Sequence, residues 1–133
     1  MIEYKMIKEF KEKELEELFL SVNWSSGKYP DKLKIAMLNS DTVITAWDGE
    51  KLVGLMNALS DKVMTAYFHY LLVNPFYQDK GIGKALVEKM LKVYEEYARK
   101  VLIAYEEEMG FYEKLGFEHH TDKKTMMITF LTT

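Results

Sequence analysis

The polar stretch QDKGIGK at residues 78–84 combines residue types that suit the binding of an anion. Gly81 and Gly83 carry no side chain that would keep a ligand away from the backbone, and one glutamine and two lysines add hydrogen-bond donors. Helical periodicity begins within this stretch, and the first amides of a helix are unpaired and lie at the positive end of its dipole. The stretch is therefore suited to a phosphate or pyrophosphate group.

Two interpretations of residues 78–84 remain open from these residues alone. The stretch lacks the fixed glycine, lysine and hydroxyl spacing of a Walker loop, and it lacks the third glycine of the dinucleotide fingerprint. Short glycine patterns are weak signals, so a strand-to-helix turn without any ligand explains the residues equally well.

Composition limits what the chain can be. Its 133 residues, 48% of them hydrophobic, suffice for one core, so we expect a single domain over residues 1–133. The net charge of -3 and pI of about 5.7 give no basic surface for nucleic acid. The chain has no cysteine, which excludes disulfides, thiolate metal sites and a cysteine nucleophile. No apolar run approaches the length of a membrane span, and we expect a soluble cytoplasmic protein.

The elements that must hold the loop follow from hydrophobic periodicity. A short strand at residues 2–4 precedes an amphipathic helix within 11–22, and a second helix begins at Pro30. Three strand-like runs follow, and Asp48-Gly49 is a strong tight-turn signal between the first two of them. The three runs span residues 42–47, 51–60 and 63–73 and favour an antiparallel meander.

The second half of the chain alternates helices and strands. A broad apolar stripe from Ile82 to Ala98 predicts the longest helix, and the continuous apolar run VLIAY at 101–105 predicts a parallel strand buried on both faces. A short helix within 109–117 can end at Gly116 in a left-handed cap. The runs FEHH (117–120) and TMMITFL (125–131) predict a last hairpin. The expected fold is α+β, with a mixed central sheet of about seven strands flanked by four helices.

The order of these elements resembles that of the GCN5-related N-acetyltransferase (GNAT) family, and so do the runs HYLLVNPFYQDKGIGKALVEKM (69–90) and FYEKLGF (111–117). In that family a strand, a Gln/Arg-x-x-Gly-x-Gly/Ala loop and a helix bind acetyl-coenzyme A. The resemblance implies that residues 78–84 offer amides to the pyrophosphate. It also implies that a bulge at Leu72 and Val73 offers backbone groups to the pantetheine arm. The implied coenzyme-binding residues are Leu72, Val73, Gln78, Asp79, Lys80, Gly81, Ile82, Gly83 and Lys84.

Acetyl transfer from a thioester to an amine needs a neutral nucleophile, a donor for the developing oxyanion and a proton for the departing thiolate. It needs no metal. The main-chain N–H of Val73 is the expected oxyanion donor. Tyr112 stands where the family often places the general acid, and the alternative for this residue is a half-buried aromatic without a catalytic role.

His69 is the candidate base or proton relay, with Tyr67 beside it on the same face of the strand. Some family members carry histidines at these two offsets, whereas others carry a glutamate at the first. A hydrogen-bonded core histidine is the alternative for His69. The chain departs from many relatives in having Tyr67 rather than glutamate and in having no asparagine within 101–110.

The candidate residues for binding the acceptor amine are Trp24, Ser25 and Tyr29, because the loop between the first two helices commonly covers the acceptor in this fold. The aromatic pair can pack against an amine-bearing chain, including by cation–π contact. Equally, Trp24 can serve only to fill the core beneath the loop. The acidic run Glu106–Glu108 is most simply a solvated surface.

The resemblance implies an acetyl-CoA-dependent N-acetyltransferase that acts on a small primary amine or a peptide amine by direct attack in a ternary complex. An inactive acyl-CoA-binding sensor and a structural domain without a ligand are the alternatives. A monomer and a homodimer, paired or exchanged through the strand TMMITFL, are both compatible with the residues.

Overall fold

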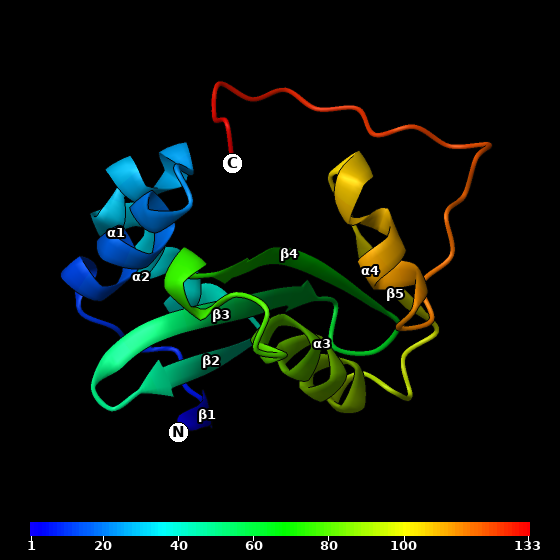
Figure 1. Ribbon diagram of the computed structural model, residues 1–133. Helices are drawn as coiled ribbons and strands as arrows, with labels where there is room; N and C mark the ends of the chain where they lie inside the picture. The colour runs from blue at the N-terminus through cyan, green and yellow to red at the C-terminus, as the bar shows by residue number, and fades with distance from the viewer.

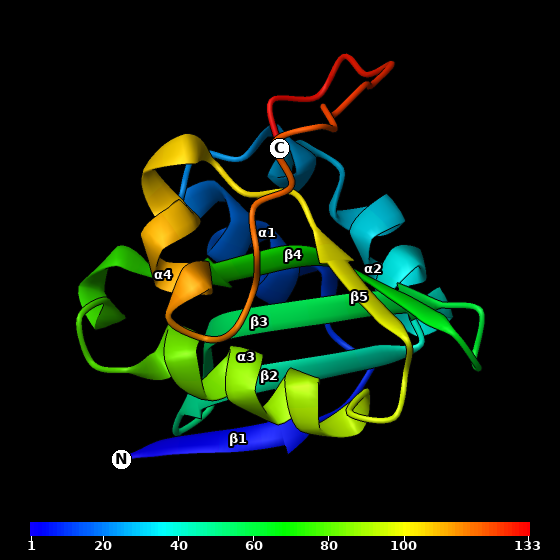
Figure 2. The same ribbon diagram turned by 90° about the vertical axis from the view of Figure 1, so that its right-hand side faces the viewer.

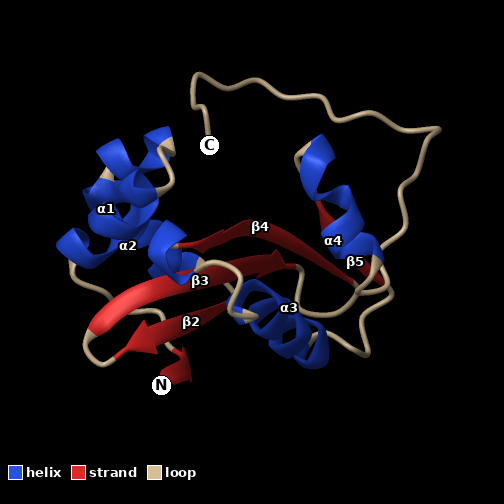
Figure 3. Cartoon of the chain, in the orientation of Figure 1, coloured by secondary structure: helices blue, strands red, loops and turns tan.

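The computed structural model describes residues 1–133, with five strands and four helices (Figures 1 and 3). The strands are β1 (Ile2–Met6), β2 (Thr42–Asp48), β3 (Lys51–Ser60), β4 (Thr65–Val73) and β5 (Arg99–Leu102). The helices are α1 (Glu12–Ser21), α2 (Pro30–Asn39), α3 (Ile82–Val93) and α4 (Met109–Glu113). Three single 3₁₀ turns complete the set: η1 (Ser25–Lys28), η2 (Pro75–Tyr77) and η3 (Glu106–Glu108). No helix has the length and apolarity needed to cross a membrane.

One mixed sheet, in the order β1-β2-β3-β4-β5, organises the molecule. Neighbouring strands are antiparallel except β4 and β5, which are parallel. Figure 2 shows α3 and α4 in front of the sheet and α1 behind it. The α+β fold with a single mixed sheet and four helices is therefore confirmed.

Two apolar cores lie on the two faces of this sheet, and each is built by an amphipathic helix. On one face, Leu15, Leu18 and Phe19 of α1 pack with residues of α2, β3 and β4. On the other face, Ile82, Leu86 and Met90 of α3 pack with residues of β2, β3 and β4. Burial of each such side chain stabilises the folded state by roughly 1.5–3 kcal/mol. Packing of these two helices therefore holds the sheet between them.

A β-bulge interrupts β4 at its middle. Leu71 lies opposite Met56 and Phe68 lies opposite Ala58, so that His69 and Tyr70 together face the single residue Asn57. The side-chain carbonyl of Asn57 accepts a hydrogen bond from the Tyr70 amide at 2.8 Å, which replaces the missing rung of the ladder. The family resemblance placed the bulge at Leu72 and Val73; it lies at His69 and Tyr70 instead.

β4 and β5 separate immediately before the bulge. They pair only over Thr65–Phe68 and Arg99–Leu102. The rest of β4 keeps its pairing with β3 but has no strand on its other side. The sheet therefore opens along the second half of β4.

The end of the chain differs from the expectation of seven strands. Residues 117–133 form no strand, and they pass from α4 over the molecule toward α1 (Figure 1). The composition of TMMITFL suits a strand, but a hairpin needs a sheet edge to be stable, and this segment contacts none in the chain. As a result β5 is the edge strand with a half-exposed face, rather than a strand buried on both faces.

Candidate functional site

A cleft of about 1010 Å³ lies where β4 separates from β5. One wall is the second half of β4, and the others are the loop that leads into α3, the segment from Ile103 through α4, and residues near the end of the chain. Most lining residues are apolar, with a few polar groups among them. Such a mixture is typical of pockets that bind organic molecules.

The loop before α3 is shaped by two residues with positive φ. Asp79 has φ of 63°, and Gly81, with φ of 79°, is the residue that directly precedes the helix. The first intrahelical hydrogen bond runs from the Ala85 amide to the Gly81 carbonyl at 3.0 Å. The amides of residues 82–84 come before this bond and are therefore without helical partners. This arrangement fits an anionic group at the start of α3.

Gly83, in the first turn of α3, lies beside Phe111 of α4. A Cβ atom at this position would lie 3.6 Å from Cζ of Phe111, which is an ordinary contact. The fold therefore has room for a small side chain at Gly83. If such a side chain abolishes ligand binding, the clash is with the ligand rather than with the protein. At Gly81 the positive φ alone disfavours other residues.

The backbone of Val73 points into the cleft. The amide of the next residue, Asn74, donates to the Val53 carbonyl of β3 at 2.8 Å. Since backbone groups alternate along a strand, the N–H and C=O of Val73 point away from β3. The side-chain amide of Gln78 donates to the Val73 carbonyl at 3.3 Å.

The structure brings the residues of the predicted coenzyme site together, with one exception. Those that line the cleft are Leu72, Val73, Gln78, Asp79, Gly81, Ile82, Gly83 and Lys84. Lys80 is exposed and does not line the cleft.

Tyr112 lines the same cleft from α4. Its ring packs edge-on against Phe111 and Phe117, with centroids at 5.0 and 5.8 Å. Burial, together with the nearby carboxylate of Glu108, raises the pKa of Tyr112 to about 12. The phenol is consequently protonated at neutral pH, as a proton donor must be.

His69 lies in a stack of three rings on the β4 side of the cleft. Its ring centroid is 5.4 Å from that of Tyr67 and 4.0 Å from that of Tyr70. His69 is exposed, but partial loss of hydration in the stack lowers its pKa below the ordinary value of 6.5. The same effect raises the pKa of Tyr67. At neutral pH the imidazole is therefore uncharged and has a lone pair to accept a proton.

Trp24 both lines the cleft and packs on the core. Its ring centroid lies 6.2 Å from Phe19 and 6.1 Å from Tyr70. Ser25 and Tyr29 do not line the cleft; they contact the end of the chain instead. The hydroxyl of Ser25 accepts a hydrogen bond from the Thr132 amide at 2.8 Å, and the rings of Tyr29 and Phe130 lie 6.3 Å apart.

Several cleft residues were missed by sequence reasoning. They are Tyr77 from the loop before α3, Ile103, Tyr105 and Glu108 after β5, Phe111 of α4, and Met127, Thr129 and Leu131 near the end of the chain. Phe111 lies in the motif FYEKLGF, and Tyr105 ends the apolar run VLIAY. Both runs were recognised in the sequence, so these two residues could have been predicted as part of the site. Glu108 belongs to the acidic run that looked like solvated surface. No local sequence pattern predicts that residues 127–131 line the cleft, because they reach it only through the course of the whole chain after α4.

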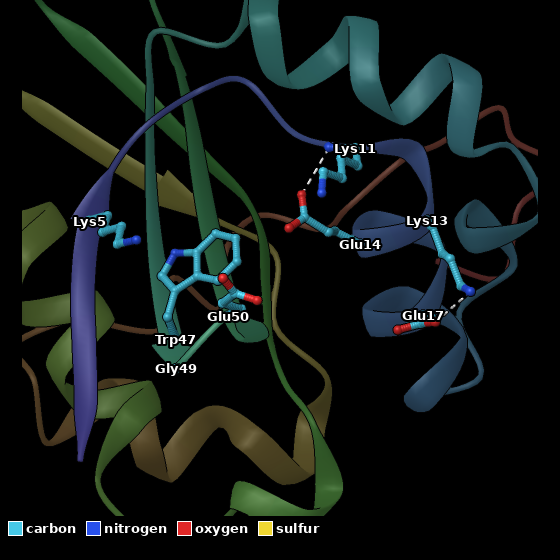
Figure 4. Close-up of a pocket in the computed structure, with 8 residues that line it drawn as sticks. All are labelled: Lys5, Lys11, Lys13, Glu14, Glu17, Trp47, Gly49 and Glu50. Carbon is cyan, nitrogen blue, oxygen red and sulfur yellow. Dashed lines mark hydrogen bonds and ion pairs between the residues drawn. The ribbon is translucent and has the colours of Figure 1, made fainter.

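A second hollow of about 520 Å³ lies beside β1, the start of α1 and the β2–β3 turn (Figure 4). Figure 4 shows lysines and glutamates around Trp47, and Lys13 pairs with Glu17 at 3.9 Å. The Nζ atom of Lys5 lies 5.0 Å from the Trp47 ring centroid. This hollow is a solvated surface of mixed charge, without the apolar walls of the cleft.

Comparison with curated proteins finds named N-acetyltransferases. A chloroplast protein of Arabidopsis thaliana, GCN5-related N-acetyltransferase 2, is 40% identical over 78 residues, which cover 53% of this chain and 30% of that protein. An uncharacterized N-acetyltransferase, ycf52, of Pyropia yezoensis is 34% identical over 110 residues, which cover 78% of this chain and 63% of that protein. The chain thus spans less than two thirds of the length of these relatives.

Solved structures agree in fold. A GNAT-family acetyltransferase of Streptococcus pneumoniae TIGR4 superposes with a TM-score of 0.82 and 30% identity, covering 97% of both chains. A probable acetyltransferase of meticillin-resistant Staphylococcus aureus gives a TM-score of 0.86 and covers 98% of this chain and all of its own, but at 19% identity it shows the fold alone. Residues 6–117 match the sequence pattern of the acetyltransferase (GNAT) family. Since the match includes β2 to β5, α3 and α4, this chain belongs to that family.

Proposed function

We propose that this protein transfers the acetyl group of acetyl-CoA to a primary amine of a small molecule or a peptide, by direct attack in a ternary complex. The observation that carries the proposal is the cleft itself. It joins the unpaired amides at the start of α3, the outward backbone of Val73 and the protonated phenol of Tyr112 on one continuous surface.

The residues around the cleft suit each part of the coenzyme. The amides of residues 82–84 would hold the pyrophosphate, with Lys84 adding positive charge. The backbone of Val73 would bind the pantetheine arm or the carbonyl oxygen. The hydrogen bond from Gln78 to the Val73 carbonyl is of the kind that an amide of the pantetheine arm can replace.

The chemistry needs two proton transfers, and the cleft offers one residue for each. As the amine nitrogen forms its bond to the acetyl carbon, His69 takes the proton that the amine gives up. The carbon–sulfur bond breaks with its electron pair on sulfur, and Tyr112 donates the proton that makes a thiol. The Val73 amide stabilises the developing oxyanion. No cysteine is present to form a thioester intermediate, in keeping with direct transfer.

A thermal-shift titration tests the coenzyme site first. Acetyl-CoA and free CoA should raise the melting temperature, and ATP should not. If neither coenzyme raises it, the cleft does not hold acyl-CoA and the proposal fails. Release of CoA thiol in the presence of a panel of small amines and peptides then tests catalysis. Coenzyme binding without thiol release from any acceptor would favour an acyl-CoA sensor.

Initial-rate kinetics test the order of events. Direct attack predicts intersecting lines in double-reciprocal plots for acetyl-CoA and the amine. Parallel lines, together with an isolated acetyl-enzyme, would contradict the ternary complex.

A further inference from the structure

The last residues of the chain form part of the cleft wall, and every second side chain takes part. The side chains that line the cleft are those of Met127, Thr129 and Leu131. The side chains between and before them are largely exposed, at 93%, 106% and 82% for Met126, Ile128 and Phe130. This alternation is that of an extended chain lying along a surface. We call residues 127–133 the strap.

The strap joins two walls of the cleft. On the η1 side, the Ser26 amide donates to the Thr133 carbonyl at 2.8 Å. The Thr132 amide donates to the Ser25 hydroxyl, also at 2.8 Å. On the β5 side, the hydroxyls of Tyr105 and Thr133 share a hydrogen bond. Figure 1 shows this end of the chain above β4, between α1 and α4, so the strap bridges the opening of the cleft.

Ser26 connects the strap to the candidate base. Its hydroxyl forms a hydrogen bond of 2.9 Å with the hydroxyl of Tyr70, and the ring of Tyr70 stacks on His69 with centroids 4.0 Å apart. In the proposed reaction the acceptor amine has to reach His69, whereas the start of α3 holds the pyrophosphate. The strap therefore lies at the acceptor end of the cleft.

The strap limits the space into which an acceptor can extend from His69. Its backbone crosses between η1 and Tyr105, and Met127 and Leu131 add apolar surface to a cleft that Trp24 also lines. A small amine with an apolar body suits such a covered, mainly apolar compartment. A peptide needs an open groove or sheet edge along which its neighbouring residues can lie.

We propose that the strap is the outer wall of the acceptor site and restricts the acceptor to small primary amines. Met127, Thr129 and Leu131 contact the body of the amine, and the anchors at Ser25 and Tyr105 keep peptide chains out. The inference rests on the proposed function, because it concerns the acceptor of that reaction.

The same strap can open to admit the acceptor. No backbone hydrogen bond joins residues 118–131 to the rest of the chain, and the attachment lies at Thr132 and Thr133. A segment with so few contacts opens at a small cost in free energy. The strap thus selects by size and still allows the product to leave.

A disulfide tests the strap without any ligand, and the absence of native cysteine makes the result unambiguous. Ser25→Cys combined with Thr132→Cys should lose both free thiols on oxidation and remain a single chain on a non-reducing gel. Ser25→Cys combined with Ile128→Cys is the matched control and should keep its thiols, because Ile128 faces away from the cleft. Free thiols in the first variant, or a bond that joins two chains, would overturn the strap.

Two substitutions on the inner side of the strap test its contact with the acceptor. Met127→Ala and Leu131→Ala enlarge the compartment and should each raise kcat/KM for hexylamine relative to propylamine several-fold. Ile128→Ala removes an apolar side chain from the outer side and should leave this ratio unchanged. The Kd for CoA should keep its wild-type value in all three variants. A wild-type ratio in both inner variants would contradict the contact.

Release of the anchors tests the exclusion of peptides. Ser25→Ala combined with Tyr105→Phe removes two hydroxyls that hold the strap, and it should raise kcat/KM for the tripeptide Gly-Lys-Gly relative to propylamine several-fold. Ser21→Ala combined with Tyr97→Phe removes the same atoms away from the strap and should not change the ratio. A wild-type enzyme that acetylates the tripeptide as efficiently as propylamine, or an unchanged ratio in the anchor variant, would overturn the restriction to small amines.

Failure of this inference can be told apart from failure of the proposed function. Absence of CoA binding, or of thiol release with every amine, would contradict the proposed function and the acceptor assignment with it, but the disulfide between positions 25 and 132 would still form. Normal CoA binding and thiol release, with free thiols in that double variant, would contradict the strap alone.

Discussion

The ring of Phe111 lies over Gly83, with its Cζ atom 3.6 Å from the position that a Cβ atom would take. This contact connects α4, which carries the candidate acid, to the first turn of α3, which is suited to the pyrophosphate. The two halves of the proposed chemistry are therefore positioned by one packing contact.

We expect Gly83→Asp to abolish CoA binding, because its carboxylate would repel the pyrophosphate at the start of α3. The fold should persist, since a Cβ atom there makes an ordinary contact. Isothermal titration with CoA and a melting curve of the free protein measure the two effects. Gly110→Asp makes the same change on α4, outside the cleft lining, and should bind CoA normally. Normal affinity in Gly83→Asp would place the pyrophosphate elsewhere.

Tyr112→Phe should reduce kcat by about 10²-fold or more while the Kd for acetyl-CoA changes little. The substitution removes the donated proton but keeps the ring that packs on Phe111 and Phe117. Because the pKa of Tyr112 is raised to about 12, the wild-type enzyme should show no loss of activity from ionisation of this phenol up to about pH 10. A wild-type kcat in Tyr112→Phe would remove this residue from the mechanism.

His69→Ala should slow the reaction most in the range from about pH 6 to pH 8, where an alkyl amine of pKa about 10 is almost entirely protonated and needs a base. Loss of hydration lowers the pKa of His69 below its ordinary value, which favours the uncharged imidazole that can act as the base. The ratio of mutant to wild-type kcat/KM should therefore rise as the pH is raised. A ratio that stays constant with pH would indicate that His69 only packs in the ring stack.

Asp41→Asn should destabilise the fold by about 2 kcal/mol at pH 7, since hydrogen bonds to a charged group are lost. The carboxylate accepts from Lys62 Nζ and from the Tyr94 hydroxyl, both at 2.6 Å, and these bonds lower the pKa of Asp41 to about 2. A depressed carboxyl pKa stabilises the fold above the unfolded pKa of about 3.9 and loses this effect as the pH falls through about 2.

Urea unfolding at pH 7 and at pH 2 measures this difference. The gap in stability between wild type and Asp41→Asn should be largest at pH 7 and should shrink at pH 2. Asp122→Asn removes an exposed partner of Lys123 and serves as the control, with an expected change near zero. Equal stability of Asp41→Asn and wild type at pH 7 would refute the role of this network.

Local patterns in the sequence were sufficient for most of the fold. The apolar stripe from Ile82 predicted α3, and the positive φ of Gly81 and Gly116 agrees with the turns expected there. The meander of β2, β3 and β4 followed from β-branched runs and the Asp48-Gly49 turn. These features depend on residues close together in the chain, which is why sequence alone reveals them.

The errors all concern partners distant in sequence. The position of the bulge depends on the side chain of Asn57, which is 13 residues from Tyr70. The last hairpin was predicted from a suitable composition, but pairing needs an edge that the chain does not bring to it. Nothing local indicated that residues 130–133 reach Ser25 and Tyr29, and the assignment of these two residues to the acceptor stays a prediction.

Because of the extra residue at the bulge, the side chains of β4 alternate between the two faces of the sheet in a different order before and after it. Before the bulge, even-numbered side chains such as Phe68 face the α3 core, whereas after it the odd-numbered Leu71 and Val73 do so. Tyr70 and Leu72 face the α1 core instead. Regular pairing of all the residues of β4, without a bulge, would send Leu71, Leu72 and Val73 to the opposite layers. The bulge is therefore what lets a strand with one extra residue place both halves of its side chains in the correct layers.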